Sequence, residues 1–233
     1  SWQVAERDLE KRWGFKKAWL LNDVEALFWG VNYPYTEKIE LIQGAKKKGN
    51  GVMVAVGTGL GVAGSCYTPE GSIIFSSEAG HMDFSAHNKE EILLFQFLEK
   101  QFSHLSYERL LSGQGLENIY SYFSEGKKEK AFYIIKKAEN KECELCINSC
   151  SLFTSILARF CADVALAFKA YAGVYLAGGI STHLVKIWDI EKFHQHFCFK
   201  GRLSSVLEKI PLFLCPSQEL GLWGAYIFAK KHL

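Results

Sequence analysis

Two polar residues that could act on a hydroxyl group follow the first apolar segment of the sequence. Asn22 and Asp23 come directly after the run Ala18 to Leu21, which we expect to be a strand. Because strand ends open onto the ligand crevice of an α/β sheet, the Asp23 carboxylate could accept a hydroxyl proton. The alternative is that Asp23 only caps the following helix. The local sequence does not decide between these two roles.

A second group of polar residues, Glu78, His81 and Asp83, lies in SEAGHMDF just beyond another expected strand. Carboxylates accept hydrogen bonds and an imidazole can donate one, which suits a polyhydroxylated ligand because each buried hydroxyl needs both. A metal site is the rival, but no further His, Cys or acid stands nearby at a recognisable ligand spacing. Glu108 is an isolated acid in an apolar helical context, where a surface or salt-bridged role is more common.

The glycine-rich segment GTGLG, Gly57 to Gly61, ends an expected strand. Consecutive amides in such a turn form an anion-binding concavity, and Thr58 adds a hydroxyl donor, so the segment suits a phosphate. A tight hairpin that needs positive φ is the structural alternative. Gly59, Gly61 and Gly64 also spell the dinucleotide fingerprint, but that fingerprint requires a helix to start within the glycines, whereas β-type residues follow here.

The cysteines and two histidines carry weaker signals. Cys143, Cys146 and Cys150 are spaced i, i+3 and i+7 and share one helix face, but no fourth ligand is apparent, so a metal or redox function is disfavoured. The odd total of 7 cysteines predicts reduced thiols and a cytoplasmic location. His194 and His196 show no partner and are interpreted as surface residues.

Helices and strands alternate along the chain, which predicts an α/β fold. Before and after GTGLG we expect a strand, glycine turn, strand, turn, strand meander. Helix dominates from Lys89 to Tyr171, and the apolar stripe from Phe153 to Tyr171 is expected to be core. The other expected elements are helices at 4–13 and 23–31, strands at 18–21, 38–41, 52–56, 72–75, 173–177 and 210–215, a basic turn at 46–51, a helix-like 181–188 and a terminal helix at 222–232.

Composition excludes several classes of protein. The chain has 233 residues, 48% of them hydrophobic, and a formal charge of +2. This charge is too small to argue for nucleic acid or an acidic membrane surface as partner. The longest weakly polar stretch, Ala162 to Ile180, contains charges and glycines and is a poor membrane span.

Taken in order, the motifs resemble bacterial glucokinases of the hexokinase superfamily. They are LLND at 20–23, AVGTGLGVA at 55–63, SEAGHMDF at 77–84, ERLLSGQGLENIY at 108–120, GVYLAGGI at 173–180, FKGR at 199–202 and IPLFL at 210–214. The resemblance runs from about Trp2 to the end. Several motifs in the right order at compatible spacing are far more specific than any one of them.

The resemblance implies ATP-dependent phosphorylation of glucose at its 6-hydroxyl, with Mg²⁺ carried by the nucleotide. It implies two ribonuclease-H-like α/β domains of the actin-like type, and a homodimer is common in similar enzymes. The residues it assigns are Asp23 as general base, Asn22, Glu78, His81 and Glu108 on the sugar hydroxyls, Gly57, Thr58 and Gly59 at the phosphates, and Gly178 and Gly179 beside the adenosine.

The sequence departs from the family pattern in two places. Ala79 stands where the family usually has Gly, and the family's first phosphate motif, an Asp followed by paired glycines and a Thr, is absent. We therefore expect a remnant of the small domain at 1–32, a complete large domain at 33–218, and a C-terminal helix at 219–233 whose Leu222, Trp223 and Phe228 are more exposed than in the intact fold. We also expect weak or no activity from this polypeptide.

Two rivals remain at this stage. One is a non-catalytic sugar-binding or regulatory homologue of the kinase. The other is a dinucleotide-dependent oxidoreductase built on Gly59 to Gly64.

Overall fold

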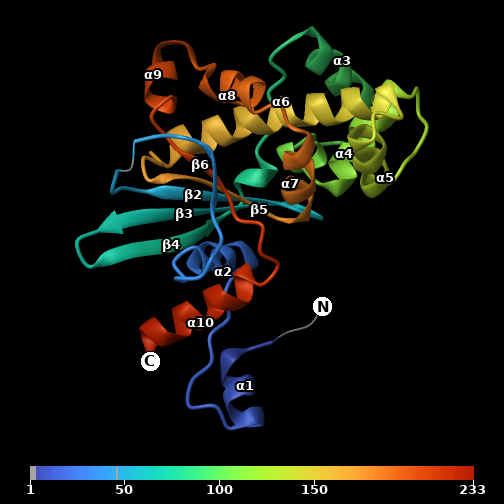
Figure 1. Cartoon of the computed structure of the whole chain (residues 1–233). Helices are drawn as coiled ribbons and strands as arrows, with labels where there is room; N and C mark the ends of the chain where they lie inside the picture. The colour runs from blue at the N-terminus through green and yellow to red at the C-terminus, as the bar shows by residue number, and fades with distance from the viewer. Residues whose placement is uncertain (1–3, 46) are drawn as a thin grey trace.

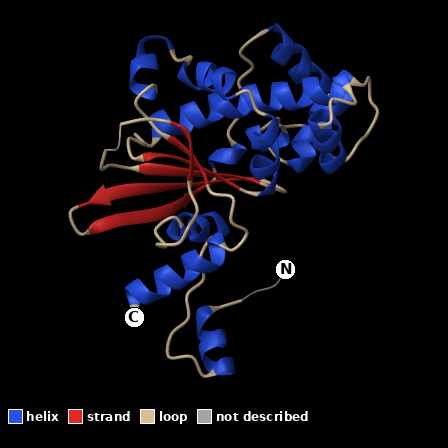
Figure 2. Cartoon of the chain, viewed as in Figure 1, coloured by secondary structure: helices blue, strands red, loops and turns tan. Residues whose placement is uncertain are grey.

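A six-stranded mixed sheet forms the middle layer of the protein, seen in a computed structural model that describes residues 4–45 and 47–233 (Figure 2). The strand order is β1-β6-β5-β2-β3-β4, in which β2, β3 and β4 form the expected antiparallel meander. β5 runs parallel to both β2 and β6, and β1 is antiparallel to β6. The strands are β1 Ile39–Ile42, β2 Gly51–Val56, β3 Leu60–Thr68, β4 Gly71–Ser77, β5 Gly173–Ala177 and β6 Leu212–Leu214.

Helices cover both faces of this sheet (Figure 1). α3 to α9 lie on one face, α2 and α10 lie on the other, and α1 lies beyond them. The helices are α1 Glu6–Trp13, α2 Asp23–Gly30, α3 Lys89–Leu98, α4 Gly113–Phe123, α5 Ala131–Glu139, α6 Glu144–Ala167, α7 Gly179–Leu184, α8 Ile190–Cys198, α9 Ser204–Leu207 and α10 Leu220–His232. The structure is therefore a mixed α/β fold with three layers.

The central strand β2 shows why both faces are covered. Val52, Val54 and Val56 belong to the larger apolar core with α6, whereas Met53 belongs to the smaller core with α2 and α10. Successive side chains of a strand point to opposite faces, so an all-apolar strand needs a layer on each side. The carboxyl end of β2, from which the glycine turn leaves, is held rigidly between the two cores.

The longest helix, α6, is the core helix of the larger layer. It is long and apolar enough to cross a membrane by length and composition, but 61% of its most apolar window is buried inside the protein. Phe153, Ile156 and Phe160 are almost completely buried, as the stripe predicts. The end of the stripe is different, because Ala167 and Tyr171 are exposed.

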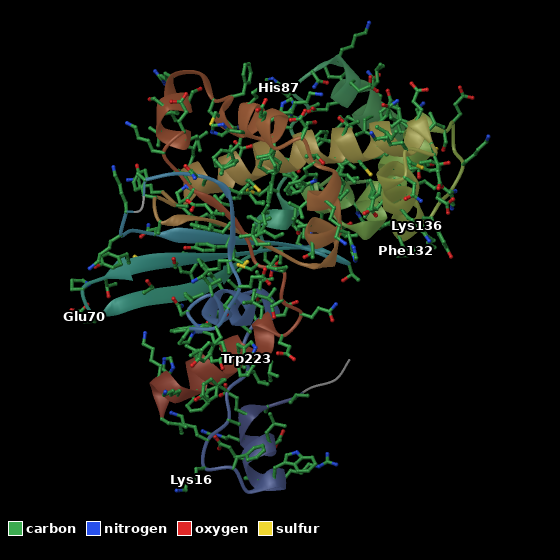
Figure 3. The ribbon with its side chains drawn as sticks, in the orientation of Figure 1. Lys16, Glu70, His87, Phe132, Lys136 and Trp223 are labelled. Carbon is green, nitrogen blue, oxygen red and sulfur yellow. The ribbon has the colours of Figure 1, made fainter. Side chains whose placement is uncertain are left out.

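The terminal helix α10 crosses α2 at very close range. A Cβ placed on Gly224 would lie 1.6 Å from the carbonyl oxygen of Ala26, so only glycine permits this crossing. Leu222 is 67% exposed, whereas Trp223 (Figure 3) and Phe228 are half-buried. The ring centroids of Trp223 and Tyr33 are stacked 4.3 Å apart, and Phe228 packs against Trp29. Whether these side chains are more exposed than in the intact fold stays a prediction.

The expected strand at Ala18 to Leu21 does not form. The segment is irregular, and its amides are taken by carboxylates of α1: Ala18 donates to Glu10 and Leu20 donates to Glu6. The segment packs through Trp19 instead, whose ring contacts that of Phe228 of α10 edge-on.

Two other expectations are not decided by the fold. Lys46, at the start of the expected basic turn, lies outside the described residues. The domain limits at residues 32 and 218 stay a prediction.

Candidate functional site

A cavity of about 350 Å³ opens where α2, the β2–β3 turn and two short 3-10 helices, Ala79–His81 and Tyr107–Arg109, come together. It brings together nearly all the residues that the sequence singled out. Lining it are Asn22, Asp23, Glu78, His81 and Glu108 with Gly57, Thr58, Gly59 and Gly178. Polar side chains from four separate segments of the chain thus line the same cavity.

Asp23 is the first residue of α2, and its side chain is exposed toward this cavity. The alternative role as helix cap belongs instead to Asn22, whose side-chain oxygen accepts hydrogen bonds from the amides of Val24 and Glu25. Asp23 Oδ1 accepts only from the amide of the next residue, at 2.9 Å. A carboxylate that faces the cavity in this way can act as a general base on a hydroxyl group bound there.

Gly61 sets the position of this helix start. A Cβ on Gly61 would lie 2.2 Å from a methyl carbon of Val24, the residue after Asp23. The absence of a side chain on β3 therefore lets the N-terminus of α2 approach the sheet. This close packing is a reason for glycine that the sequence interpretation missed.

Glu108 is neither a surface residue nor part of a salt bridge among the described residues. Its Oε2 accepts a hydrogen bond from the backbone amide of Leu60 at 3.0 Å, and a Cβ on Gly59 would lie 2.7 Å from the same oxygen. The carboxylate thus lies directly against the glycine turn. A second link runs the other way, because the amide of Gly113 donates to the carbonyl of Gly57 at 2.8 Å.

The GTGLG segment forms the tight hairpin turn between β2 and β3 that the structural alternative supposed, but without positive φ. Gly57, Gly59 and Gly61 have no positive φ, so the turn does not need glycine for its backbone angles. The chain continues directly into β3 instead of a helix, which removes the dinucleotide fingerprint as an explanation. What the glycines provide is space for Glu108 and Val24, together with an open turn carrying the Thr58 hydroxyl.

Glu78 and His81 lie on the rim of the cavity. The Glu78 side chain is 85% exposed and that of His81 57%, and their Oε2 and Nε2 atoms are 3.9 Å apart. Gly80 between them packs against the start of β3, where a Cβ would lie 2.0 Å from the carbonyl oxygen of Leu60. The substituted position Ala79 is buried, and the short helix still forms. Ser77 also lines the cavity and was not anticipated.

The second pair of glycines follows β5, the strand beside β2. Gly178 has φ +94°, and a Cβ there would lie 2.3 Å from the carbonyl oxygen of Val56, so this position requires glycine. Gly179 begins α7 and is not among the residues that line the cavity. Because β2 and β5 are parallel neighbours, both glycine segments leave the sheet at the same edge.

Three sequence candidates lie elsewhere. Asp83 points away from the cavity and contacts His104, with Oδ1 and Nε2 2.6 Å apart. His194 and His196 are half-buried rather than surface residues, so that interpretation is wrong. They lie on α8 and do not line the cavity.

The arrangement suits a small polyhydroxylated ligand next to a phosphate. Three carboxylates and an imidazole can pair with hydroxyl groups, while the open turn and Thr58 can donate to phosphate oxygens. Among the described residues, no group of three or more His, Cys, Asp or Glu could hold a metal ion.

Comparison with known proteins identifies the family of the chain. The family model described as "Glucokinase" matches residues 1–232. The glucokinase of Salmonella heidelberg is 33% identical over 244 residues, covering 100% of this chain and 75% of that protein.

Solved structures show the same architecture. The glucokinase from an Antarctic psychrotroph has a TM-score of 0.87 and 26% identity, covering 97% of this chain and 72% of that one. The ROK-family glucokinase from Streptomyces griseus, solved with glucose and AMPPNP, has a TM-score of 0.64 and 18% identity over 97% and 72% of the two chains. A whole-chain family match, a close structural match and a single cavity holding the motif residues agree, and the chain belongs to the glucokinase family.

Proposed function

We propose that this protein binds a glucose-like hexose in the cavity and transfers a phosphoryl group to the sugar's 6-hydroxyl from ATP. The observation that carries the proposal is the convergence of Asp23, Glu78, His81 and Glu108 beside the glycine turn. The solved Streptomyces relative, which carries glucose and an ATP analogue, supports this choice of ligands.

Each side chain would have a distinct role. Asp23 would take the proton of the attacking hydroxyl, while Asn22, Glu78, His81 and Glu108 would hold the other hydroxyls. Glu108 has two oxygens, and with Oε2 accepting from Leu60 its Oε1 can accept from the sugar. Holding the hydroxyl in line with the phosphate is the main contribution a protein makes to this reaction.

The nucleotide would lie along the sheet edge where the two glycine segments emerge. Thr58 and the amides of Gly57 and Gly59 would contact its phosphates, with Gly178 and Gly179 bordering the adenosine. Mg²⁺ would come bound to the phosphates, where it neutralises charge on the transferring group. A cytoplasmic location fits this use of ATP and is part of the proposal.

Titration calorimetry with glucose on the 233-residue chain tests the sugar site directly. We expect saturable binding that weakens at least about tenfold in Glu78→Gln, because each lost charged acceptor costs on the order of 1.5–3 kcal/mol. The matched control is Glu70→Gln, which changes an acid of the distant β3–β4 hairpin (Figure 3). Absence of glucose binding by the unchanged chain would contradict the sugar site.

A coupled assay for sugar phosphate, with ATP and with glucose, mannose or fructose, then tests the transfer step. The alternative is a sugar-binding homologue without kinase activity. Glucose binding without product, both in this chain and in the product of the whole open reading frame, would support that alternative.

A further inference from the structure

Three cysteines lie at the start of α6, well separated from the sugar cavity, which none of them lines. Cys143 is the residue before the first helical turn, Cys146 lies within that turn, and Cys150 follows one turn later. Cys143 is half-buried, whereas Cys146 and Cys150 are buried. Residues 143–146 form a Cys-X-X-Cys sequence. Its first cysteine is accessible at a helix N-terminus.

The backbone of Cys143 brings the first two thiols together. Its φ of −146° and ψ of 114° are extended, so this residue is not held to the spacing of the helix. Cys143 is the N-cap residue of α6 and Cys146 is the third residue of the helix, the two positions whose side chains meet at a helix start. Cys146 and Cys150 are both helical, and their Cβ atoms are therefore about 5–6 Å apart, beyond the roughly 3.5–4.5 Å that a disulfide needs. The geometry selects one pair out of the three thiols.

The surroundings favour ionisation of Cys143 over that of Cys146. Partial burial opposes ionisation of Cys143, but hydrogen bonds from Cys146 and the amides of Cys146 and Leu145 outweigh it and lower the pKa of the thiol. Lys137 of α5 adds positive charge, although it is paired with Glu129 at 2.6 Å. Burial raises the pKa of the Cys146 thiol to about 12. The two thiols therefore differ in both access and charge.

We propose that Cys143 and Cys146 form a redox-active dithiol, in which Cys143 is the peroxide-reactive sulfur and Cys146 the thiol that closes the disulfide. Accessible thiolates at helix N-termini in Cys-X-X-Cys segments are the reactive cysteines of proteins. This site is independent of the proposed sugar phosphorylation.

The oxidant is a hydroperoxide, and the reaction proceeds in two steps. The Cys143 thiolate attacks one peroxide oxygen, the O–O bond breaks, and the leaving hydroxide takes a proton to become water, leaving a sulfenic acid. Cys146 sulfur then attacks the Cys143 sulfur, the S–O bond breaks, and the thiol proton leaves with the hydroxide as a second water. Two thiols lose two electrons and two protons while the peroxide is reduced.

Mass spectrometry of the intact chain tests this reaction. Reduced protein is treated with a small excess of hydrogen peroxide at neutral pH, its free thiols are alkylated, and it is cleaved with trypsin without reduction. Cleavage after Lys141 and Arg159 places all three cysteines in one peptide. We expect this peptide to lose two alkylation sites and about 2 Da, with fragment ions that place the linkage between residues 143 and 146.

Variants identify the role of each sulfur. Cys150→Ser should form the same disulfide at the same rate. Cys146→Ser should stop at a sulfenic acid on residue 143 that dimedone traps, and Cys143→Ser should leave Cys146 and Cys150 reduced.

Cys66 provides an internal control, because it is exposed on β3, remote from the other cysteines in sequence. Alkylation of the reduced chain at pH 6.5 should modify Cys143 roughly tenfold faster than Cys66. Oxidation of Cys66 while the 142–159 peptide keeps three free thiols would overturn the proposal. A disulfide that includes Cys150 in the unchanged chain would also overturn it.

Discussion

Asp23 is the side chain on which the proposed reaction depends most. Asp23→Asn keeps the size and position of the side chain at the start of α2 but removes its basicity. Activity is measured in this chain or in the product of the whole open reading frame, whichever phosphorylates the sugar. We expect the turnover of the variant to fall about 10²–10⁴-fold. Glucose affinity measured by calorimetry should change by less than about threefold. Retained turnover would contradict the assignment of Asp23 as base.

Gly59 is predicted to control the position of the Glu108 carboxylate. In Gly59→Ala the new methyl group would meet Glu108 Oε2, which cannot move away without losing its hydrogen bond from Leu60. We expect glucose binding to weaken about tenfold, since a displaced charged acceptor costs on the order of 1.5–3 kcal/mol. Thermal unfolding should be followed in parallel. Unchanged glucose affinity in a folded Gly59→Ala protein would argue against a sugar contact by Glu108.

At the residue level, the sequence indicated which side chains belong to the site but not which contacts hold them in place. Asp23, Glu78 and Glu108 could be selected because acids beside apolar segments and glycine turns stand out. The sequence could not show that Asn22, rather than Asp23, caps α2, because both residue types cap equally well. Spacing alone groups Asp83 with Glu78, yet Asp83 forms an isolated bridge with Ser106 and does not line the cavity.

At the level of elements, the crossing of α10 and α2 gives a prediction with an internal control. In Gly224→Ala the new Cβ would clash with the backbone of Ala26, and because neither group is on a flexible side chain the helices must separate. We expect the free energy of unfolding to fall by about 1–3 kcal/mol, the usual cost of overpacking. Urea denaturation measures this loss.

Gly221→Ala is the matched control on the same helix. Its Cβ would make an ordinary contact with Leu27 at 3.7 Å. Alanine favours helix over glycine, so stability should stay the same or rise by up to about 1 kcal/mol. Helix propensity alone would raise the stability of both variants. Equal losses in both variants would therefore contradict the close crossing at Gly224 as the cause of the effect.

Most elements could be predicted from periodicity, although the sequence did not indicate α8 and α9, and the one expected strand that fails to form has a clear cause. β2, β5 and α6 are long or strongly apolar, so their patterns leave little choice. The run at 18–21 has the composition of a strand but lies beyond α2 and α10 rather than beside the sheet. Phe228, against which Trp19 packs, comes from the far end of the sequence, and the amides of Ala18 and Leu20 bind carboxylates of the preceding helix α1 instead of a neighbouring strand.

At the level of the whole molecule, a buried charge cluster joins α3, α6 and α8. Glu91 is completely buried, accepts hydrogen bonds from Asn88 and the amide of His87, and pairs with Arg159. His196 of α8 lies near this pair. Burial lowers the pKa of His196, and Arg159, His87 and Lys192 lower it further, while Glu91 acts in the opposite direction.

This cluster predicts how stability depends on pH. Because the pKa of His196 is lower in the folded than in the unfolded protein, the unfolded chain binds the proton more readily. The stabilising effect is therefore present above the unfolded pKa of about 6.5 and is lost as the pH falls below it. Urea midpoints at pH 7.5 and 5.5 should differ more in the unchanged protein than in His196→Gln. The same difference in both proteins would contradict this effect.

Opposed hydrogen bonds tie the β2–β3 turn to the segment that carries Glu108: Leu60 donates to that carboxylate, and Gly113 donates back to Gly57. A ligand that shifts the β2–β3 turn therefore also shifts the Glu108 segment, and the reverse holds, without any large motion. Two ligands that each strengthen these hydrogen bonds would raise each other's affinity. Thermodynamic reciprocity requires the factor of increase to be the same in both directions. We therefore expect positive cooperativity between the proposed sugar and nucleotide, carried by one backbone hydrogen bond and one carboxylate.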